Sequence, residues 1–512
     1  MTKGLRRLDI RTKRRGSEWK KAATGRRDRR IARKEELMTT EKKNHLRSPF
    51  SDGRAFSAFM LGLCLCFYLF FACFDGAVIC VDSPSYIEMD ISREPLYCLL
   101  LAVFRAVFSG FGADFYLTAV AFFQSILAAF ATWSLVNYIR KECKTPKPVS
   151  LLLLCMPLAV SLLCRFAARR GSMYSNSILT EGITISCYLL FFRYLLEYCF
   201  HQTKKGLVLS CVVAFLMISA RKQMVIALAM LAVCILVRGI RSRNAGRSVA
   251  LLAVCAVGVL GGSTLLDLGY NYVVRQDAVR HSSDGRFITT MAFYTAERSD
   301  AAYIEDEEIR ELFLQIYDAC DEQGYLKHSA GKGWLNRVEH FGDSYDCIQI
   351  DTMWPAVNAF VRERYGEDDV VLSEHADRIM GVINVSVLPH NLGKLTASFL
   401  DNFLSGLITT VAQRNPVLNW YSLVAYCVYL LLLLWNLWVG KNRRVLQIGG
   451  LVLLSIFFNV GLVSLVIFCQ TRYTIYNMAL FYIALILMLN EWWKARSFSG
   501  RFARSALDRP ER

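Results

Sequence analysis

Long apolar runs recur along most of the chain and are separated by short polar stretches. A helix needs about 20 apolar residues to cross roughly 30 Å of hydrocarbon. The run at residues 206–239 exceeds one crossing and is interrupted by Arg221, Lys222 and Gln223, so it predicts two short crossings. The other runs lie at residues 56–75, 115–138, 149–164, 178–199, 249–268, 417–439, 446–469 and 474–490. The pattern predicts an all-α polytopic membrane protein with about ten transmembrane helices.

The composition strengthens this interpretation. The chain has 512 residues, of which 54% are hydrophobic and 12% aromatic, and its mean hydropathy is +0.31. Soluble proteins of this length rarely reach such a value. A soluble enzyme is therefore excluded, and the functional residues must be sought at the ends of membrane helices or in the polar segments between them.

A further apolar stretch at residues 95–109 opens with Pro95 and is too short to span a bilayer. If it does not cross, the short basic segments between later runs all fall on the side of the N-terminus, as the positive-inside tendency favours. These segments are YIRKECKTPKPVS, HQTKK, RGIRSRNAGR and GKNRR. The sequence therefore predicts a long first outer loop at residues 76–114, with an apolar helix that lies along the membrane surface.

Both ends of the sequence are basic. Residues 1–55 carry 19 Lys or Arg and 7 Asp or Glu, and their apolar content is too low for a folded core. We expect a disordered cytoplasmic tail that contacts anionic lipid, and no nucleic-acid partner. About 50 polar residues precede the first run, so no cleavable signal peptide is expected. The basic segment at residues 491–512 predicts a C-terminus that is cytoplasmic as well.

One large polar segment, at residues 269–392, has the opposite sign of charge. It contains 22 Asp or Glu and 11 Lys or Arg. Turn signals such as SSDG, DEQG and RYGEDD interrupt stretches with helical periodicity. We expect a small, mostly helical extracytoplasmic domain, which separates an N-terminal membrane module at residues 56–268 from C-terminal membrane helices at residues 393–490.

The 17 cysteines add little to the picture. Most lie in apolar runs, where a thiol behaves as a small hydrophobic group. No CxxC or Cys/His spacing typical of a zinc site occurs. Cys320 and Cys347 both lie in the predicted extracytoplasmic domain, and the sequence leaves open whether they form a disulfide.

Two carboxylates at the outer boundaries of predicted helices are candidates for a functional site. Asp82 follows the first run, where a carboxylate near the headgroups is costly unless it is hydrated, paired or used. A helix N-cap ahead of Pro84 is the structural alternative. Glu181 lies about one turn into a later run and should face protein or a hydrated cavity. A purely structural ion pair is the alternative for Glu181.

Several cations lie at outer boundaries as well. Arg165 and Arg169, in RFAARRGSMYSNS, are on the side where positive charge is disfavoured, so we expect an anionic partner, with phospholipid as the alternative. Arg221, Lys222 and Arg472 lie at further boundaries, where long side chains also snorkel. Together, these cations and the carboxylates would converge on a cavity that suits a lipid-linked phosphate, which guanidinium groups bind through charge-assisted hydrogen bonds.

The order of several short phrases resembles that of the GT-C superfamily. The first run is followed by an acidic residue within the phrase DSPSY, and the phrase REPLY then opens the in-plane helix. Later, LTE lies at the start of a span, RKQ separates two short spans, and TRY opens the last span. The similarity is best over residues 56–265. GT-C proteins are polytopic glycosyltransferases that use polyprenyl-phosphate sugars, as in the protein mannosyltransferases and aminoarabinose transferases of family 39 and their bacterial relatives.

The resemblance implies a role for each matching residue. Asp82 would be the catalytic carboxylate of the first loop, and Glu181 would support the cavity. Arg221 and Arg472 would hold the donor phosphate, with Arg165, Arg169 and Lys222 as further candidates for that contact. The residues that shape the first loop and its in-plane helix would be Tyr86, Arg93 and Tyr97.

The identity of the base stays open at one point. Some relatives carry two adjacent acids in the first loop, whereas Ser83 follows Asp82 here. Asp75 and Asp90 are therefore alternative bases, and Glu88 is a further supporting carboxylate. A divalent cation at Asp82 with Asp90 or Glu88 is an alternative because hard cations prefer oxygen ligands, but the spacing matches no known metal-binding loop. No metal or other cofactor is predicted.

The resemblance implies an inverting glycosyl transfer in a bacterial cytoplasmic membrane, from a polyprenyl-phosphate sugar to a hydroxyl of an extracytoplasmic glycan, lipid or protein. One carboxylate acts as general base, and arginines stabilise the departing phosphate. The alternatives are a polymerase or ligase of lipid-linked glycans, and a transporter or flippase of a lipid-linked substrate. Transporters often show inverted repeats with broken helices, and the break at Arg221 has no evident counterpart in the second half of the chain.

Overall fold

The computed structural model describes residues 53–167, 171–282, 285–440 and 442–507, with side chains described up to residue 166 in the first range and up to residue 496 in the last. The chain divides into two units, Met1–Gly62 and Leu63–Arg512. Of the first unit, only residues 53–62 are described, and they form the beginning of helix α2. The second unit contains the remaining described elements, and the paragraphs below concern that unit.

Long helices dominate the described residues, and nine of them are long and apolar enough to cross a membrane. The protein is therefore an all-α, multi-pass membrane protein, as the sequence predicts. The apolar helices are α2 (Gly53–Asp75), α5 (Phe115–Cys143), α6 (Lys147–Ala167), α7 (Glu181–His201), η4–α9 (Lys222–Val225 and Ile226–Arg241), α10–η5–α11 (Ala245–Ala256, Val257–Gly261 and Gly262–Arg275), α18–η10 (Pro416–Trp435 and Asn436–Gly440), α19 (Arg443–Val466) and α20 (Thr471–Leu507).

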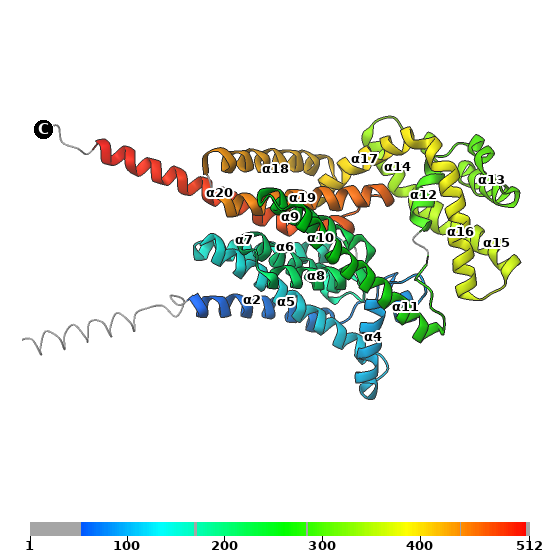
Figure 1. The fold of residues 1–512 in the computed structure, drawn as a ribbon, viewed down its shortest axis with the longest axis horizontal. Coiled ribbons are helices and arrows are strands. Elements are labelled where there is room, and N and C mark those ends of the chain that lie inside the picture. Colours follow the sequence, from blue (N-terminus) through cyan, green and yellow to red (C-terminus); the bar gives the residue numbers. More distant parts are fainter. Residues whose placement is uncertain (1–52, 168–170, 283–284, 441, 508–512) are drawn as a thin grey trace, which may run out of the picture. The chain divides into compact units, whose positions relative to one another are not determined.

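The tenth predicted crossing corresponds to the shorter helix α8 (Lys204–Ala220), which has 17 residues. Gln202 adopts a left-handed conformation that ends α7, and the Thr203 hydroxyl caps α8 by accepting a hydrogen bond from the Gly206 amide at 3.0 Å. At the other end of this hairpin, Arg221 meets Glu181, the first residue of α7. Helix α8 therefore returns along the whole length of α7 (Figure 1).

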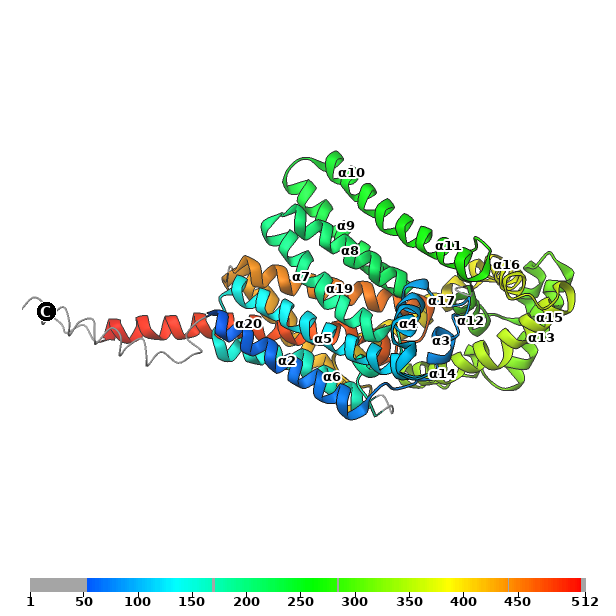
Figure 2. The same cartoon turned by 90° about the horizontal axis from the view of Figure 1, so that it is seen from below.

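The first loop, residues 76–114, contains two helices. These are α3 (Ser83–Ile87) and α4 (Pro95–Phe108), and α4 is followed by the short turn η2 (Ser109–Phe111). Helix α4 runs across the direction of α5 in Figure 1 and is seen nearly end-on in Figure 2. It buries Tyr97, Cys98 and Leu101 on one face. The apolar stretch that the sequence predicts to lie along the membrane surface thus forms a separate transverse helix.

The acidic segment folds as a set of helices with its own core, which we call the α12–α16 unit. Asp306 and Asp368 cap the N-termini of α13 and α16, respectively, by accepting hydrogen bonds from backbone amides. Cys320 and Cys347 are both unbonded thiols. The elements are α12 (Gly285–Thr295), η6 (Arg298–Tyr303), α13 (Glu307–Glu322), η7 (Lys327–Ser329), α14 (Trp334–Asp346), η8 (Cys347–Met353), α15 (Trp354–Tyr365) and α16 (Asp369–Val387), and they enclose aromatic and aliphatic side chains.

The turn η9 (Leu388–Asn391) leads from this unit into α17 (Leu392–Val411), a helix that the sequence pattern does not single out. The Asn402 side chain of α17 donates to the Ile467 carbonyl at 2.8 Å and accepts from the Cys469 amide at 2.7 Å. At the end of α17, the Val411 carbonyl accepts a hydrogen bond from the Tyr482 hydroxyl at 2.8 Å. Helix α17 is therefore bound to the segment between α19 and α20 and to α20 itself.

Candidate active site

Five charged side chains form an alternating series that we call the ion-pair chain: Arg221, Glu181, Arg472, Asp82 and Arg93. Arg221 Nη1 lies 2.8 Å from Glu181 Oε1, and Arg472 Nε binds the same oxygen. Arg472 Nη2 lies 2.7 Å from Asp82 Oδ2. Arg93 Nη2 lies 3.5 Å from Asp82 Oδ1. The ion-pair chain joins the first loop to the ends of α7, α8 and α20.

Asp82 takes the position of a helix cap without acting as one. It precedes α3 at the N-cap position, but its side chain makes no capping hydrogen bond. The next residue fixes the turn instead, because the Ser83 hydroxyl accepts from the Cys80 amide at 2.7 Å and donates to the Ile178 carbonyl at 2.8 Å. The Asp82 carboxylate is therefore left for Arg93 and Arg472.

A short stretch of paired backbone holds the first loop against the segment before α7. Among the described residues it is the one extended pairing, between Val78 and Ser177. The Val78 amide donates to the Asn176 carbonyl at 2.9 Å, and the Ile178 amide donates to the Val78 carbonyl at 3.0 Å. This pairing brings Asp82 close to Glu181, although the two residues lie on different segments of the chain.

Glu181 is completely buried and is held by two guanidinium groups. A buried carboxylate without partners costs several kcal/mol, so the two arginines are needed to keep it charged. Thr180 adds a third contact, because its hydroxyl donates to Glu181 Oε2 at 3.3 Å and accepts from Arg221 Nη1 at 3.3 Å. The sequence leaves open an ion pair between Glu181 and the basic loop at residues 165–170, whereas the structure pairs it with Arg221 and Arg472.

Arg221 occupies the break between α8 and η4, as the interrupted apolar run predicts. Its backbone is extended, and its Nε donates to Gln223 Oε1 at 3.1 Å. Gln223 also donates to Asn459 Oδ1 at 2.7 Å and to the Tyr473 carbonyl at 2.9 Å. Because Tyr473 follows Arg472 in α20, this amide fixes both arginines of the pair around Glu181.

Tyr86, Arg93 and Tyr97 form the wall of the first loop. The Arg93 guanidinium lies 4.6 Å from the centre of the Tyr86 ring, and its Nε donates to the Ser85 hydroxyl at 2.8 Å. Tyr86 packs edge-on against Tyr97 at a ring distance of 5.4 Å. Burial raises the pKa of Tyr86 to about 12, so its hydroxyl stays protonated. These side chains position Arg93 beside Asp82.

Opposing effects act on the Asp82 carboxyl. Burial acts to raise its pKa, but Arg472 and Arg93 outweigh burial and hold the pKa below the usual range of aspartate. The Asp82 side chain is 29% exposed, whereas the Glu181 side chain is not exposed at all. Asp82 is thus an ionised carboxylate that is partly open to solvent, while Glu181 is enclosed by protein.

Two of the other predicted residues form a separate ion pair. Asp75, at the end of α2, binds Arg165, at the end of α6. The Arg165 guanidinium also lies 5.3 Å from the Phe71 ring and 5.6 Å from the Phe74 ring. The described residues show no hydrogen bond or ion pair between this couple and the ion-pair chain. Asp75, the alternative base, and Arg165, a candidate phosphate ligand, are thus occupied by each other.

The remaining candidates lie at the edge of the site or outside the described residues. Glu88 and Asp90 are exposed, and Asp90 accepts from the Ser92 amide at 2.7 Å. The Lys222 backbone amide donates to Glu94 Oε1 at 2.9 Å, which ties η4 to the first loop. Arg169 lies among the residues that the structure does not describe.

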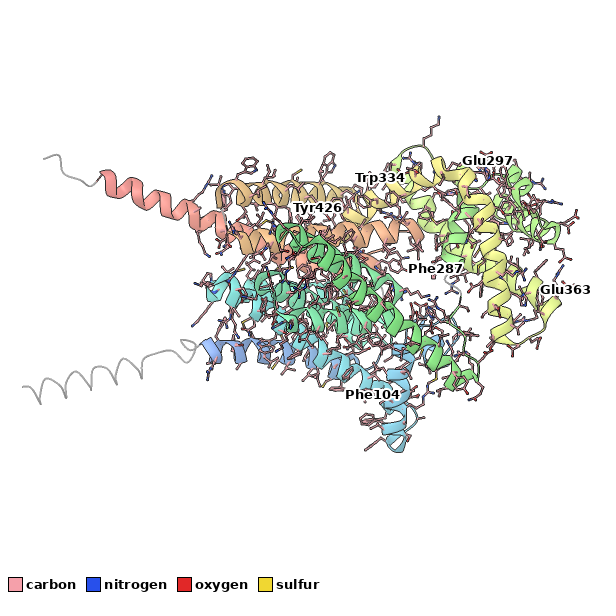
Figure 3. All side chains as sticks on the ribbon, viewed as in Figure 1. Phe104, Phe287, Glu297, Trp334, Glu363 and Tyr426 are labelled. Atoms are coloured by element: carbon pink, nitrogen blue, oxygen red, sulfur yellow. The ribbon has the colours of Figure 1, made fainter. Side chains whose placement is uncertain are left out.

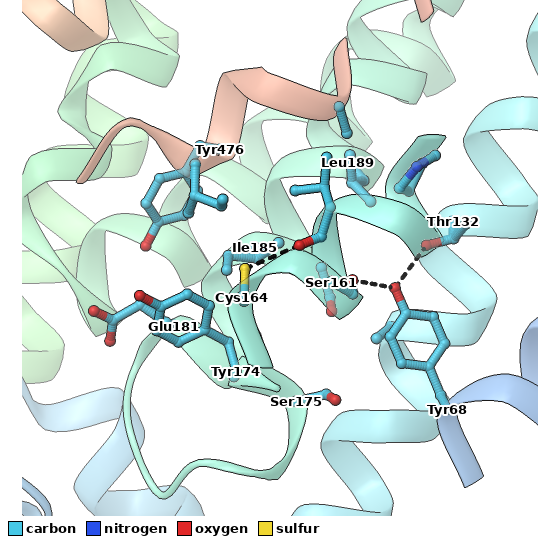
Figure 4. Close-up of a pocket in the computed structure, with 17 residues that line it drawn as sticks. Tyr68, Thr132, Ser161, Cys164, Tyr174, Ser175, Glu181, Ile185, Leu189 and Tyr476 are labelled. Atoms are coloured by element: carbon cyan, nitrogen blue, oxygen red, sulfur yellow. Dashed lines mark hydrogen bonds between the residues drawn. The ribbon is translucent and has the colours of Figure 1, made fainter. Parts of the chain in front are cut away.

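A cavity of about 40 Å³ lies next to Glu181, between α2, α5, α6, α7 and α20. Figure 4 shows Glu181 at one end and Tyr68 at the other. Tyr68 hydrogen-bonds Ser161 at 2.9 Å, and Thr132 lies nearby at 3.5 Å. A cavity needs about 10–15 Å³ per water and polar partners. This one has space and hydroxyl groups enough for more than one water behind the buried carboxylate.

Gln124 supports the site and was missed by the sequence analysis. It is fully buried in α5, accepts from the Tyr97 hydroxyl at 2.9 Å, and donates to the carbonyls of Ser175 and Ser177 at 3.1 Å. It therefore joins α4 to the segment before α7. A signal for it existed, because an amide within the apolar run AFFQSIL is costly in a membrane unless it is hydrogen-bonded.

Within the described part of the chain, no group of three or more His, Cys, Asp or Glu side chains is placed as a metal site requires. The geometry instead offers a partly open carboxylate, an enclosed carboxylate and three arginines, a set suited to binding an anion beside a base. Comparison of the sequence with protein-family models and with curated proteins gives no match.

Proposed function

We propose that this protein is an inverting glycosyltransferase of the GT-C type, which transfers a sugar from a polyprenyl-phosphate donor to an acceptor hydroxyl on the extracytoplasmic side of a membrane. The observation that carries the proposal is the ion-pair chain. It joins a partly exposed carboxylate on a loop to arginines at the ends of membrane helices. A lipid-linked phosphate would lie at such helix ends, with its chain among the apolar helices.

The donor phosphate binds Arg221 and Arg472 in this proposal. Both guanidinium groups are positioned by Glu181, and planar guanidinium groups bind phosphate oxygens through two parallel hydrogen bonds. The phosphate competes with Asp82 for Arg472, because Arg472 Nη2 lies 2.7 Å from Asp82 Oδ2. Donor binding would therefore weaken the ion pair of Asp82, raise its pKa, and make it a stronger base.

The reaction is a single displacement at the anomeric carbon. Asp82 takes the proton from the acceptor hydroxyl, the acceptor oxygen forms the new bond to the anomeric carbon, and the bond from that carbon to the phosphate oxygen breaks. Negative charge then develops on the departing lipid phosphate, where Arg221 and Arg472 stabilise it. One displacement inverts the anomeric configuration, and a second catalytic carboxylate is not needed. Glu181 orients the arginines and takes no proton.

The proposed location follows from the charge pattern. The basic tails at residues 1–55 and 491–512 would face the cytoplasm, with anionic lipid as a partner of the first tail. The acidic α12–α16 unit and the ion-pair chain would then face the opposite side of a bacterial cytoplasmic membrane. The donor sugar would be used there, away from soluble nucleotide sugars.

Replacement of the proposed base gives a direct test. Membranes that contain the native protein or the Asp82→Asn variant, at matched amounts, are supplied with a panel of radiolabelled polyprenyl-phosphate sugars. We expect the native protein to transfer one of them to endogenous acceptor, and Asp82→Asn to lose about 10²- to 10⁴-fold in rate, as removal of a general base typically does.

Asp114→Asn is the matched control because Asp114 is an exposed aspartate of the same loop and its side chain makes no capping hydrogen bond. It should retain the native rate. Full activity of Asp82→Asn would eliminate Asp82 as the base. Absence of transfer by the native protein, with labelled lipid moved across reconstituted vesicles instead, would indicate a transporter.

A further inference from the structure

Arg286, at the beginning of α12, is a cation that the ion-pair chain does not include. Its side chain is half-buried, and its Nε is buried and has no hydrogen-bond partner in the part of the chain that the structure describes. The guanidinium lies 5.7 Å from the Trp354 ring and 5.1 Å from the Phe287 ring, and Figure 3 labels Phe287 at this position. A buried polar atom without a hydrogen-bond partner is costly, so we looked for a role for this cation.

Two hydrogen bonds join the segment that precedes the α12–α16 unit to the first loop. The Ser282 amide donates to the Ile91 carbonyl at 3.1 Å, and the Arg275 guanidinium donates to the Met89 carbonyl. Arg286 follows Ser282 by four positions along the chain, a span of about 14 Å at most. Arg286 is therefore held close to the part of the loop that carries Arg93.

The charges around Arg286 agree with that placement. Burial lowers the pKa of Arg286, and the nearby Arg93 lowers it further, while Tyr345, Asp90 and Asp82 act to raise it. Tyr345 also binds the residue next to Arg286, because its hydroxyl donates to the Phe287 carbonyl at 3.2 Å. Arg286 thus lies within electrostatic reach of both Asp82 and Arg93.

The order of the ion-pair chain shows on which side of Asp82 this cation lies. Arg472 binds Asp82 Oδ2 and leads to Glu181 and Arg221, whereas Arg93 binds Asp82 Oδ1 at the opposite end. In an inverting displacement, the acceptor approaches from the side opposite the leaving group. If the phosphate binds Arg221 and Arg472, the end with Arg93 and Arg286 is the acceptor side.

The net charge of the ion-pair chain also indicates that Arg286 is not needed to bind the donor phosphate. The ion-pair chain contains three arginines and two carboxylates, a surplus of one positive charge. The phosphodiester of a polyprenyl-phosphate sugar carries one negative charge, which matches that surplus. Arg286 is then left over, and the described residues contain no carboxylate that forms an ion pair with it.

We propose that Arg286, supported by Trp354, binds an anionic group of the acceptor, so that the acceptor is a glycan that bears phosphate or carboxylate. The inference rests on the proposed function, since it assigns the acceptor of the same site. Trp354 supplies an apolar face on which a sugar ring can stack, and Arg286 supplies the hydrogen bonds that select a charged ring over a neutral one.

The test compares three sugars that differ in one group: methyl β-glucoside, methyl β-glucuronide and methyl β-glucoside 6-phosphate. Their binding to the full-length protein in lipid nanodiscs is measured by equilibrium dialysis. A hydrogen bond to a charged group contributes about 1.5–3 kcal/mol. We therefore expect native protein to bind a charged sugar at least about ten-fold more tightly than the neutral one.

Arg286→Gln should reduce this preference to less than about three-fold, with Arg286→Lys intermediate. Arg362→Gln, an exposed arginine of the same unit, should keep the native preference. Equal binding of charged and neutral sugars by native protein would overturn the inference, as would an undiminished preference in Arg286→Gln. Gel filtration and melting temperature establish that each variant is folded.

Farnesyl phosphate serves as the probe for the donor side. Arg286→Gln should bind it as native protein does, and Arg221→Gln should bind it more weakly. If Arg286→Gln lost farnesyl phosphate and kept its preference among the sugars, the anion would belong to the donor and the inference would be wrong. If native protein did not bind farnesyl phosphate, the proposed function would fail, while the sugars would still decide the role of Arg286.

Discussion

Asp82 and Glu181 are both carboxylates bound by arginines, yet their surroundings suit them to different tasks. The side chain of Asp82 is 29% exposed and that of Glu181 is fully enclosed. An enclosed carboxylate with two guanidinium partners cannot reach a substrate hydroxyl, but it fixes the direction in which those partners point. At the scale of single residues, exposure rather than charge separates the proposed base from the residue that positions the arginines.

The lowered pKa of Asp82 leads to a pH dependence. Because Arg472 and Arg93 outweigh burial and keep this pKa below the ordinary value near 3.9, the carboxylate stays ionised until the pH falls into the acid range. We expect kcat/KM, which reports the free enzyme, to be constant from about pH 7 to about pH 5 and to fall only below about pH 4. The measurement is the initial rate of sugar transfer at low donor concentration.

The acid limb of kcat should lie at higher pH than that of kcat/KM, since a bound phosphate would draw Arg472 away from Asp82. The stability that these ion pairs contribute to the folded protein also decreases as the pH falls. It is present above the unfolded pKa of aspartate and is lost as the pH falls through the folded value. An acid limb of kcat/KM near pH 6 would contradict Asp82 as the base.

The sequence could identify the members of the site but not their pairing. Asp82, Glu181, Arg221 and Arg472 each lie at the boundary of an apolar run, where charge is expensive enough to be noticed. Hydropathy carries no information about which helices are neighbours, so it could not pair Arg165 with Asp75. That pairing depends on α2 and α6 lying side by side, which only the folded chain provides.

At the scale of elements, the close approach of α5 and α7 depends on one glycine. A Cβ atom at Gly182 would lie 2.3 Å from Gln124 Oε1 and 2.5 Å from Gln124 Cδ. This amide is not free to move, because it is hydrogen-bonded to Tyr97 and to the carbonyls of Ser175 and Ser177. The helix beginning at Glu181 and the transverse helix α4 are therefore coupled through Gln124.

Gly182→Ala should break this coupling. Displacement of Gln124 leaves buried donors and acceptors without partners, at a cost of about 1–3 kcal/mol for each such group. We expect a melting temperature several degrees below that of native protein in detergent, measured by light scattering or tryptophan fluorescence. Gly450→Ala is the control, since a Cβ at that position of α19 meets nothing within 4 Å. Equal destabilisation by both changes would contradict a specific clash with Gln124.

The apolar runs predicted all nine helices in the described residues that are long and apolar enough to cross a membrane, but they did not predict α17, for a physical reason. Helix α17 carries Lys394, Asp401 and Asn402 along with its apolar residues, so it does not stand out from the polar segment before it. Tertiary contacts stabilise it, since Asp401 pairs with Arg337 and Asn402 caps the segment after α19. The apolar pattern also predicted helix α8, which is shorter than a usual membrane crossing. Packing against α7 and the ion pair between Arg221 and Glu181 stabilise this short helix.

At the scale of the whole molecule, α8 decides the topology. Six of the long apolar helices in the described residues precede the α12–α16 unit, and α8 makes a seventh crossing. With seven crossings this unit lies on the opposite side from the N-terminus, and with six it lies on the same side. The return of α8 to Glu181 favours seven.

An epitope inserted between Gly366 and Glu367 tests this topology. Both residues are exposed between α15 and α16, and the insertion leaves the Asp368 cap in place. We expect antibodies to bind this epitope on intact spheroplasts, and to bind epitopes at the N- and C-termini only after permeabilisation. Exposure of the inserted epitope and the N-terminal epitope on the same side would show that α8 does not cross.

The position of Arg472 has a consequence for biosynthesis. Glu181 enters the membrane early in synthesis and gains its first partner, Arg221, within the next hairpin. Asp82 has Arg93 in the same loop but waits longer for its second partner, because Arg472 opens α20, the last apolar helix in the described part of the chain. A nascent chain therefore carries an incomplete charge network until that helix is inserted. A chain released before α20 is made would contain every carboxylate of the ion-pair chain but lack Arg472, one of the two arginines that we propose to bind the donor phosphate.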